Sequence, residues 1–217
     1  MQSKPSRPRN AVFDRVRSAP QGAVWTPVDF LDLSGREAID KALQRLVRAG
    51  SLRRIGRGLY DSPSFNSLLQ QPNPPDPRAV IDAVARRDQI RVLIDGMTAA
   101  NDLGFTNTVP ARIIVHTDAR LKTITLGKMA ITFRPTAASK LFWAGRPAMR
   151  IIQALHWLRD TNDADDQAEV TARLSRILQD PRNGKTLRDD INDGMATLPA
   201  WMQALLRPMI QTEATAT

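Results

Sequence analysis

Residues 34–60 read SGREAIDKALQRLVRAGSLRRIGRGLY, and this stretch decides the fold of the N-terminal part of the chain. In its first half the apolar side chains recur at helical spacing, which predicts a helix that buries one face. These apolar residues are Ile39, Ala42, Leu43, Leu46 and Val47. Ser34 is the expected N-cap, Glu37 occupies the capping-box position, and Gly50 is expected to end the helix.

The opposite face of this helix is polar and mostly basic. If it is a recognition helix, it enters the major groove of DNA, where Arg pairs with guanine and Gln with adenine. Ser34 is then expected to hold a phosphate at the helix N-terminus, where backbone N–H groups are free. The other candidate DNA contacts on this helix are Arg36, Lys41, Gln44, Arg45 and Arg48. A solvated helix face without such a role is the alternative.

The second half of the stretch, residues 51–60, predicts a β-hairpin. Apolar residues and arginines alternate around Gly56-Arg57-Gly58, and glycine accepts the positive φ angles of tight turns. An arginine at such a tip offers little to a core, so contact with phosphates or the minor groove is its expected use. The candidate DNA contacts of this hairpin are Arg53, Arg54 and Arg57. A hairpin whose arginines only increase solubility is the alternative.

Two more helices are predicted before residue 34. Residues 10–19 have helical apolar spacing, and Thr26-Pro27 is a capping residue followed by proline at the first helical position of a short helix. The order helix, short helix, capped helix and hairpin predicts a winged helix-turn-helix over residues 1–62. Its N-terminal arm would follow the minor groove through Lys4, Arg7 and Arg9, unless this segment is only a disordered basic tail.

The charge distribution supports a DNA-binding role for this part of the chain. The protein has 217 residues and a formal net charge of +9. Residues 1–62 hold twelve Lys or Arg against six Asp or Glu, a net charge of +6, which leaves +3 for the other 155 residues. Such an asymmetry indicates an N-terminal nucleic-acid module, with double-stranded DNA as the partner.

Composition argues against several other classes. With no Cys, the chain has no disulfides, thiolate metal sites or Cys nucleophile, and two His leave most metal and acid–base sites short of ligands. We therefore expect no metal, no cofactor and no catalytic residues. No apolar run approaches the roughly 20 residues that span a bilayer, so we expect a cytoplasmic protein without a membrane partner.

The rest of the chain predicts a second domain, and the expected class of the whole is α+β. Residues 63–77 are proline-rich and predict a linker, residues 78–210 form the domain, and residues 211–217 are expected to be a disordered tail. The domain is expected to combine a small mixed or mainly antiparallel sheet with a helical C-terminus. The predicted strands are residues 111–116, 122–126 and 129–133, and the apolar run at residues 91–94 is either a short strand or a helix end. The predicted helices are residues 77–87, a short helix that starts at residue 95 or 98 and runs through 103, and residues 147–158, 165–178 and 199–209.

Two segments together carry a family resemblance. The first is ALQRLVRAGSLRRIGRGLY, residues 42–60. The second combines a Leu-Gly-Phe-Thr turn at residues 103–106, a Val-Pro-Ala strand entry at residues 109–111 and a Thr-Asp turn at residues 117–118. In these features the chain, over about residues 10–160, resembles the AbiEi-type antitoxins of type IV abortive-infection toxin–antitoxin systems.

The resemblance implies a transcriptional repressor that binds promoter repeats of its own operon through its N-terminal domain. It also implies an antitoxin that opposes a nucleotidyltransferase-like toxin, without a stable complex being required. Nothing in the sequence specifies an interface, so a monomer and a homodimer are both compatible with repeated operators.

Two other functional classes remain open from the sequence. One is a stand-alone winged-helix regulator whose second domain binds a protein through Trp143, Trp157 and Trp201. The other is a DNA-processing enzyme such as a nuclease, which would use Asp95, Asp102 and Asp118. The turn and helix-start positions of these carboxylates explain them without chemistry. His116 and His156 have no partner at a recognisable catalytic spacing, and structural roles are expected for both.

Overall fold

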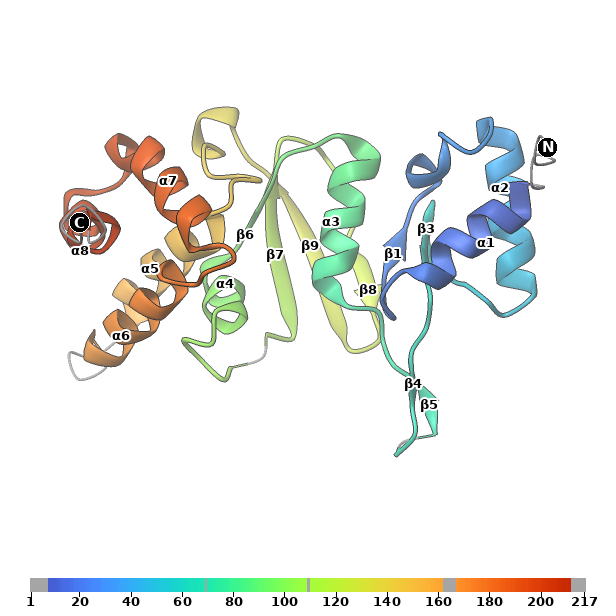
Figure 1. The fold of residues 1–217 in the computed structure, drawn as a ribbon, viewed down its shortest axis with the longest axis horizontal. Helices are drawn as coiled ribbons and strands as arrows, with labels where there is room; N and C mark the ends of the chain where they lie inside the picture. The colour runs from blue at the N-terminus through green and yellow to red at the C-terminus, as the bar shows by residue number, and fades with distance from the viewer. Residues whose placement is uncertain (1–7, 69, 109, 162–166, 212–217) are drawn as a thin grey trace. The chain divides into compact units, whose positions relative to one another are not determined.

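The computed structural model describes residues 8–68, 70–108, 110–161 and 167–211, and it confirms the α+β class. Contacts divide the chain into two compact units. The first comprises residues 1–90 with residues 122–131, and the second comprises residues 91–121 with residues 132–217. Figure 1 shows the elements of both units along the chain.

The first unit begins with a winged helix-turn-helix. Its elements are α1 (Pro8–Ser18), β1 (Val24–Trp25), the 3-10 helix η1 (Pro27–Phe30), α2 (Arg36–Arg48), β2 (Arg53–Gly56) and β3 (Leu59–Asp61). The strands form an antiparallel sheet in the order β1-β3-β2, so the wing hairpin β2–β3 is joined by the strand that precedes the helix-turn-helix. The predicted helices and hairpin are therefore confirmed.

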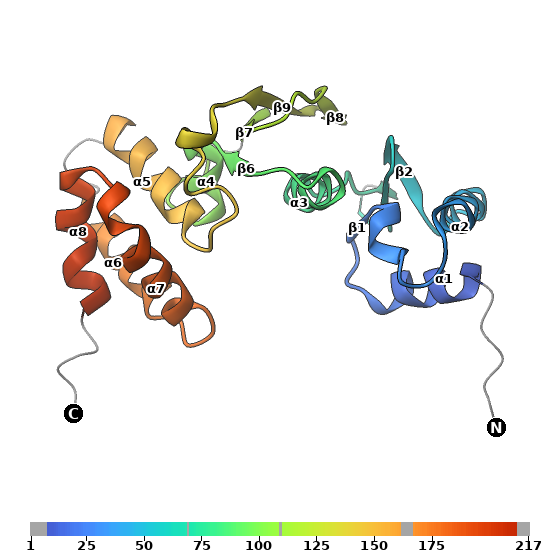
Figure 2. The ribbon, with the colours of Figure 1, turned by 90° about the horizontal axis from the view of Figure 1, so that it is seen from above.

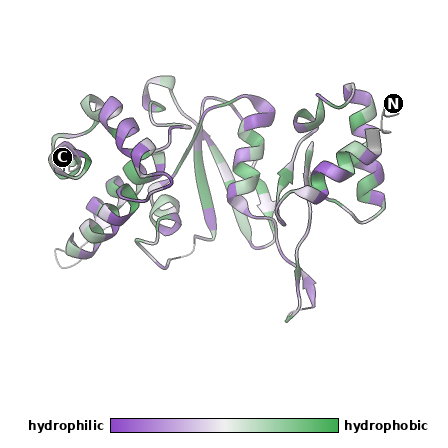
Figure 3. Cartoon of the chain, viewed as in Figure 1, coloured by the Kyte–Doolittle hydropathy of each residue, from purple (hydrophilic) through white to green (hydrophobic). Residues whose placement is uncertain are grey.

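The core of this module is built from the apolar face of α2. Ile39, Leu43 and Leu46 are fully buried there, and they pack with Val12 of α1 and Phe30 of η1. Hydrophobic and hydrophilic residues alternate along α2 in Figure 3, as the helical spacing predicts. Burial of this stripe fixes which face of α2 points toward solvent.

The ends of α2 agree with the prediction at one terminus and not at the other. Gly35, not Ser34, is the N-cap, and no side-chain cap bond is present, so the predicted Ser34 capping box is wrong. Glu37 instead pairs with Lys41, one turn along the helix. The C-terminal prediction is confirmed, because Gly50 has φ +72° and its N–H donates to the carbonyl of Val47.

The segment predicted to be a linker contains a second small hairpin. β4 (Phe65–Asn66) and β5 (Gln71–Pro72) pair antiparallel, and Asn73 closes the base of the hairpin through its N–H to Ser64 O, 2.8 Å away. α3 (Pro77–Asp88) follows, with Asp76 as its N-cap. This helix packs against β1, β3 and η1, within the same unit as the winged helix.

The four-stranded sheet has the strand order β6-β7-β9-β8. Its strands are β6 (Val92–Ile94), β7 (Arg112–Thr117), β8 (Ile124–Leu126) and β9 (Met129–Pro135). The three predicted strands are confirmed as β7, β8 and β9, while the apolar run at residues 91–94 supplies the fourth. β6 pairs antiparallel with β7, and β8 with β9.

Helices make up most of the second unit. They are α4 (Gly96–Asp102), η2 (Ala138–Lys140), α5 (Met149–Thr161), α6 (Gln167–Leu178), α7 (Gly184–Gly194), η4 (Met195–Thr197) and α8 (Ala200–Gln211). Figure 2 shows α4 and α5 on the same side of β6 and β7. α7 was not predicted. The tail expected at residues 211–217 lies, apart from Gln211, outside the described residues.

α4 and α5 pack closely because Gly96 has no side chain. A Cβ atom at this position would lie 2.5 Å from the Cβ of Trp157 and 2.7 Å from the carbonyl oxygen of Gln153.

Among the described residues, none of the helices combines the length and apolar character needed to cross a bilayer.

Candidate nucleic-acid interface

The N-terminal half of the exposed α2 face is held in ion pairs within the helix. Arg36 Nε lies 3.0 Å from Asp40 Oδ2, and Lys41 Nζ lies 2.5 Å from Glu37 Oε1. All four side chains are substantially exposed, so these pairs contribute only a few tenths of a kcal/mol to helix stability. They also offset the positive charge of this half of the helix.

The C-terminal half of the same face is exposed and basic. It carries Gln44, Arg45 and Arg48, which we call the open end of α2. Within the described part of the chain, the structure shows no ion pair or side-chain hydrogen bond for these three residues. Their donors are therefore available to a ligand.

The wing places Arg57 at the tip of a two-residue turn. Gly58 provides the positive φ angle, +63°, whereas Gly56 lies at the end of β2 and needs none. The Arg57 side chain is exposed, while its backbone carbonyl accepts a hydrogen bond from Arg87 Nη1 at 2.6 Å. Arg54 is also exposed, and its Nε donates to Gly56 O.

Arg53 occupies a different environment from the other two wing arginines. Its Nε and Nη2 donate to the carboxylate of Asp61 at 3.0 and 2.5 Å, and Nη2 also reaches the carbonyl of Asn73 at 2.9 Å. Asp61 is 1% exposed. The hydrogen bond to Asp61 raises the pKa of the Arg53 guanidinium. Arg53 thus ties the wing to the base of the β4–β5 hairpin.

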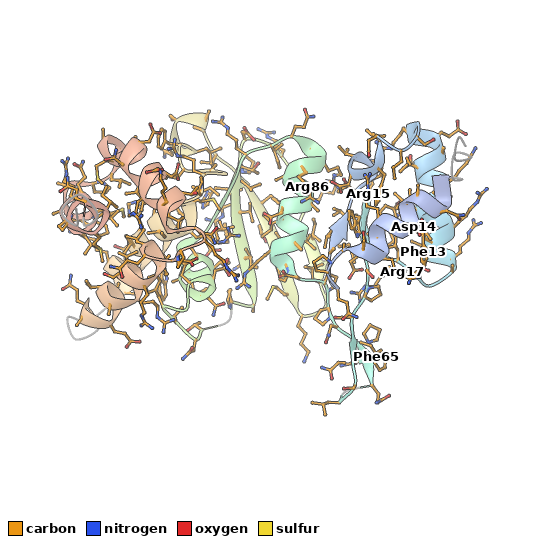
Figure 4. The ribbon with its side chains drawn as sticks, in the orientation of Figure 1. Phe13, Asp14, Arg15, Arg17, Phe65 and Arg86 are labelled. Carbon is orange, nitrogen blue, oxygen red and sulfur yellow. The ribbon has the colours of Figure 1, made fainter. Side chains whose placement is uncertain are left out.

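Arginines outside the predicted set also lie in the first unit. In Figure 4, Arg15 and Arg17 extend from α1, and Arg86 extends from α3. Arg15 is bound by Asp32 at 2.6 Å, whereas Arg17 is exposed. The predicted arm is not described, because Lys4 and Arg7 lie outside the described residues, as does the side chain of Arg9.

The carboxylates considered for an enzyme have separate internal partners. Asp95 caps α4 by accepting from Thr98, and it also accepts from the N–H of Ile114. Asp102 pairs with Arg150, and Asp118 pairs with Arg91. In the described ranges, no group of three or more His, Asp or Glu side chains is arranged to hold a metal ion.

The tryptophans considered for a protein interface differ in exposure. Trp143 is 7% exposed and packs against Phe142 and the guanidinium of Arg146. Trp201 is partly exposed, and the guanidinium of Arg159 lies 4.6 Å from its ring. Burial of Trp143 removes it from a common exposed surface with Trp157 and Trp201.

His116 is expected to make the stability of the second unit dependent on pH. Burial is the main cause that lowers its pKa below the ordinary 6.5, the charge of Arg134 acts in the same direction, and Asp95 opposes them. As the pH falls through 6.5, the unfolded chain takes up this proton before the folded chain does, so the free energy of unfolding decreases. Urea unfolding at about pH 7.5 and about pH 5.5 should show the decrease, and His116→Gln should reduce it. An equal decrease in both proteins would contradict the assignment.

Together, the fold and this surface define a winged helix-turn-helix protein whose α2 face and wing tip present exposed basic side chains. The chain belongs to DUF6088, a family of unknown function, whose family model matches residues 11–183. No curated protein matches the sequence.

Proposed function

We propose that this protein is a transcriptional repressor that binds double-stranded DNA through α2 and the wing. The observation that carries the proposal is the open end of α2, where Gln44, Arg45 and Arg48 are exposed beside a buried apolar stripe. A winged helix inserts this helix into the major groove, where such side chains recognise base edges. The net charge of +6 in residues 1–62 favours a polyanionic partner.

We assign different roles to the predicted site residues according to the contacts that each makes within the protein. Gln44 and Arg45 are assigned to base edges, with Arg48 at the groove edge, and Arg54 and Arg57 are assigned to phosphates or the minor groove. Arg36 and Lys41 keep an electrostatic role, because each is already paired with a carboxylate. Arg53 is assigned to positioning of the wing, because its guanidinium group already donates to Asp61 and to the carbonyl of Asn73.

Arg57→Ala is expected to weaken DNA binding to a similar extent for every DNA sequence, because a wing arginine contacts the backbone and not the bases. The slope of log affinity against log salt concentration should decrease by about one unit. Anisotropy titrations at several salt concentrations measure both quantities. An unchanged slope would exclude Arg57 from the interface.

We further propose that the repressor acts in the cytoplasm as the antitoxin of a type IV toxin–antitoxin system. The resemblance of residues 42–60 and 103–118 to AbiEi-type antitoxins supports this assignment, and it implies a nucleotidyltransferase-like toxin encoded beside the gene. Expression of such a neighbouring gene should arrest growth, and co-expression of this chain should restore it. Promoter binding without growth rescue would instead indicate a stand-alone regulator.

A further inference from the structure

We infer that α3 belongs functionally to the DNA-binding module, because its residue Arg87 holds the wing tip in place. The inference rests on the proposed function and assigns a positioning residue to it. The sequence places α3 at the start of the second domain, but the structure packs it against β1, β3 and η1.

The hydrogen bonds of Arg87 link its neighbour Asp88 to the wing tip. Nε and Nη2 donate to the two carboxylate oxygens of Asp88, at 2.8 and 2.6 Å. This pair directs Nη1 to the backbone carbonyl of Arg57, 2.6 Å away. The Arg87 side chain is only 22% exposed, so it is held against the protein. Asp88 therefore orients Arg87, and Arg87 fixes the turn that carries Arg57.

The wing turn also lies next to the Arg87 side chain of α3. A Cβ atom added to Gly58 would lie 3.6 Å from Cδ of Arg87 and 3.8 Å from Cδ of Pro27. The turn therefore lies beside both α3 and the start of η1. β1 pairs only with Tyr60 and Asp61 of β3, so the tip of the hairpin extends beyond the third strand and depends on this support for its order.

Arg86, the neighbouring residue, fixes the start of the helix-turn-helix in the same way. Its Nε donates to Asp29 Oδ1 at 3.2 Å and its Nη2 to Val24 O at 3.2 Å. The other oxygen of Asp29 accepts from the N–H and the hydroxyl of the buried Thr26, the N-cap of η1. Two adjacent arginines of α3 thus hold the wing tip and the first turn of η1.

The decisive variant is Asp88→Ala in the 217-residue chain. Loss of an acidic side chain makes the protein more positive, so electrostatics alone predicts tighter DNA binding. The contact between Arg87 and the wing tip, which we call the clamp, predicts weaker DNA binding instead. Without Asp88, Arg87 loses the group that orients it. We expect about fivefold weaker binding to DNA from upstream of the gene, an effect of the order of one ordinary hydrogen bond. Tighter or unchanged binding would overturn the inference.

A double-mutant cycle tests whether Arg87 acts through Arg57. Arg87→Gln should weaken binding in the wild-type background but have little effect in the Arg57→Ala background. If Arg87 contacts DNA itself, the two effects will add, and the positioning role is wrong. Arg87→Lys keeps the charge without the planar fork, so it should also be impaired.

Hydrogen exchange in the absence of DNA separates this inference from the proposed function. The backbone amides of residues 56–60 should exchange faster in Asp88→Ala than in the wild type, with α2 unchanged as an internal control for folding. Unchanged exchange at residues 56–60 would overturn the clamp even if the protein binds DNA. If the wild type fails to bind DNA while Asp88→Ala still shows the faster exchange, only the proposed function is overturned.

Discussion

Arg53→Ala is expected to lower the free energy of unfolding by about 3 kcal/mol, because it leaves the carboxylate of Asp61 buried without its partner. Asp61 is 1% exposed, and Arg53 supplies two of its hydrogen bonds. The estimate is at the lower end for a buried pair, because the Arg53 side chain is 32% exposed. Urea unfolding followed by circular dichroism measures the change.

The neighbouring Arg54 provides the matched control for this prediction. Arg54→Ala removes the same kind of side chain from the same strand, but Arg54 is exposed, and its side-chain bond shown in the structure is to Gly56 O. We expect the free energy of unfolding to change by no more than about 0.5 kcal/mol.

The double variant Arg53→Leu/Asp61→Leu should recover part of the stability that Arg53→Ala loses, because it removes the buried charge together with its partner. Equal destabilisation by Arg53→Ala and Arg54→Ala would contradict the structural role of Arg53.

The double variant Arg45→Ala/Arg48→Ala is expected to weaken binding to upstream DNA by at least about thirtyfold. Each arginine that contacts a base or groove edge contributes about 1 to 3 kcal/mol, and two such losses correspond to that factor. The substitutions lie on the solvent face of α2, so the fold should be retained. Anisotropy titration measures the affinity, and thermal unfolding verifies the fold.

Arg176→Ala/Arg207→Ala is the charge-matched control, because both residues are exposed in helices of the second unit. This variant should lose only the weak effect of two fewer positive charges. Gln44→Ala should instead change which bases are preferred within the binding site, with a smaller loss of total affinity. An equal loss for the two double variants would mean that net charge, and not the α2 surface, determines binding.

The parts of the fold set by local pattern could be predicted from the sequence. The apolar stripe of α2 and Gly50 at its end are consequences of helical periodicity and of the positive φ angle that glycine accepts. The N-cap prediction is wrong because Ser34 and Gly35 are both acceptable caps. Which of the two adjacent residues starts the helix depends on how the preceding turn packs.

The roles of individual arginines could not be predicted, because they depend on residues distant in sequence. Arg53, Arg54 and Arg57 look equivalent along the chain, yet only Arg53 meets a buried carboxylate and the carbonyl of Asn73. Arg86 and Arg87 end a helix, where basic residues are common in any case. No local signal showed that they contact the wing and η1.

Binding of the 217-residue chain to two DNA duplexes of equal length tests the central claim most directly. One duplex carries the sequence immediately upstream of the gene, and the other carries the same bases in shuffled order. At about 150 mM salt, a repressor that reads bases through α2 should bind the upstream duplex at least about a thousandfold more tightly. Equal affinity for both duplexes, or no binding to either, would contradict the account.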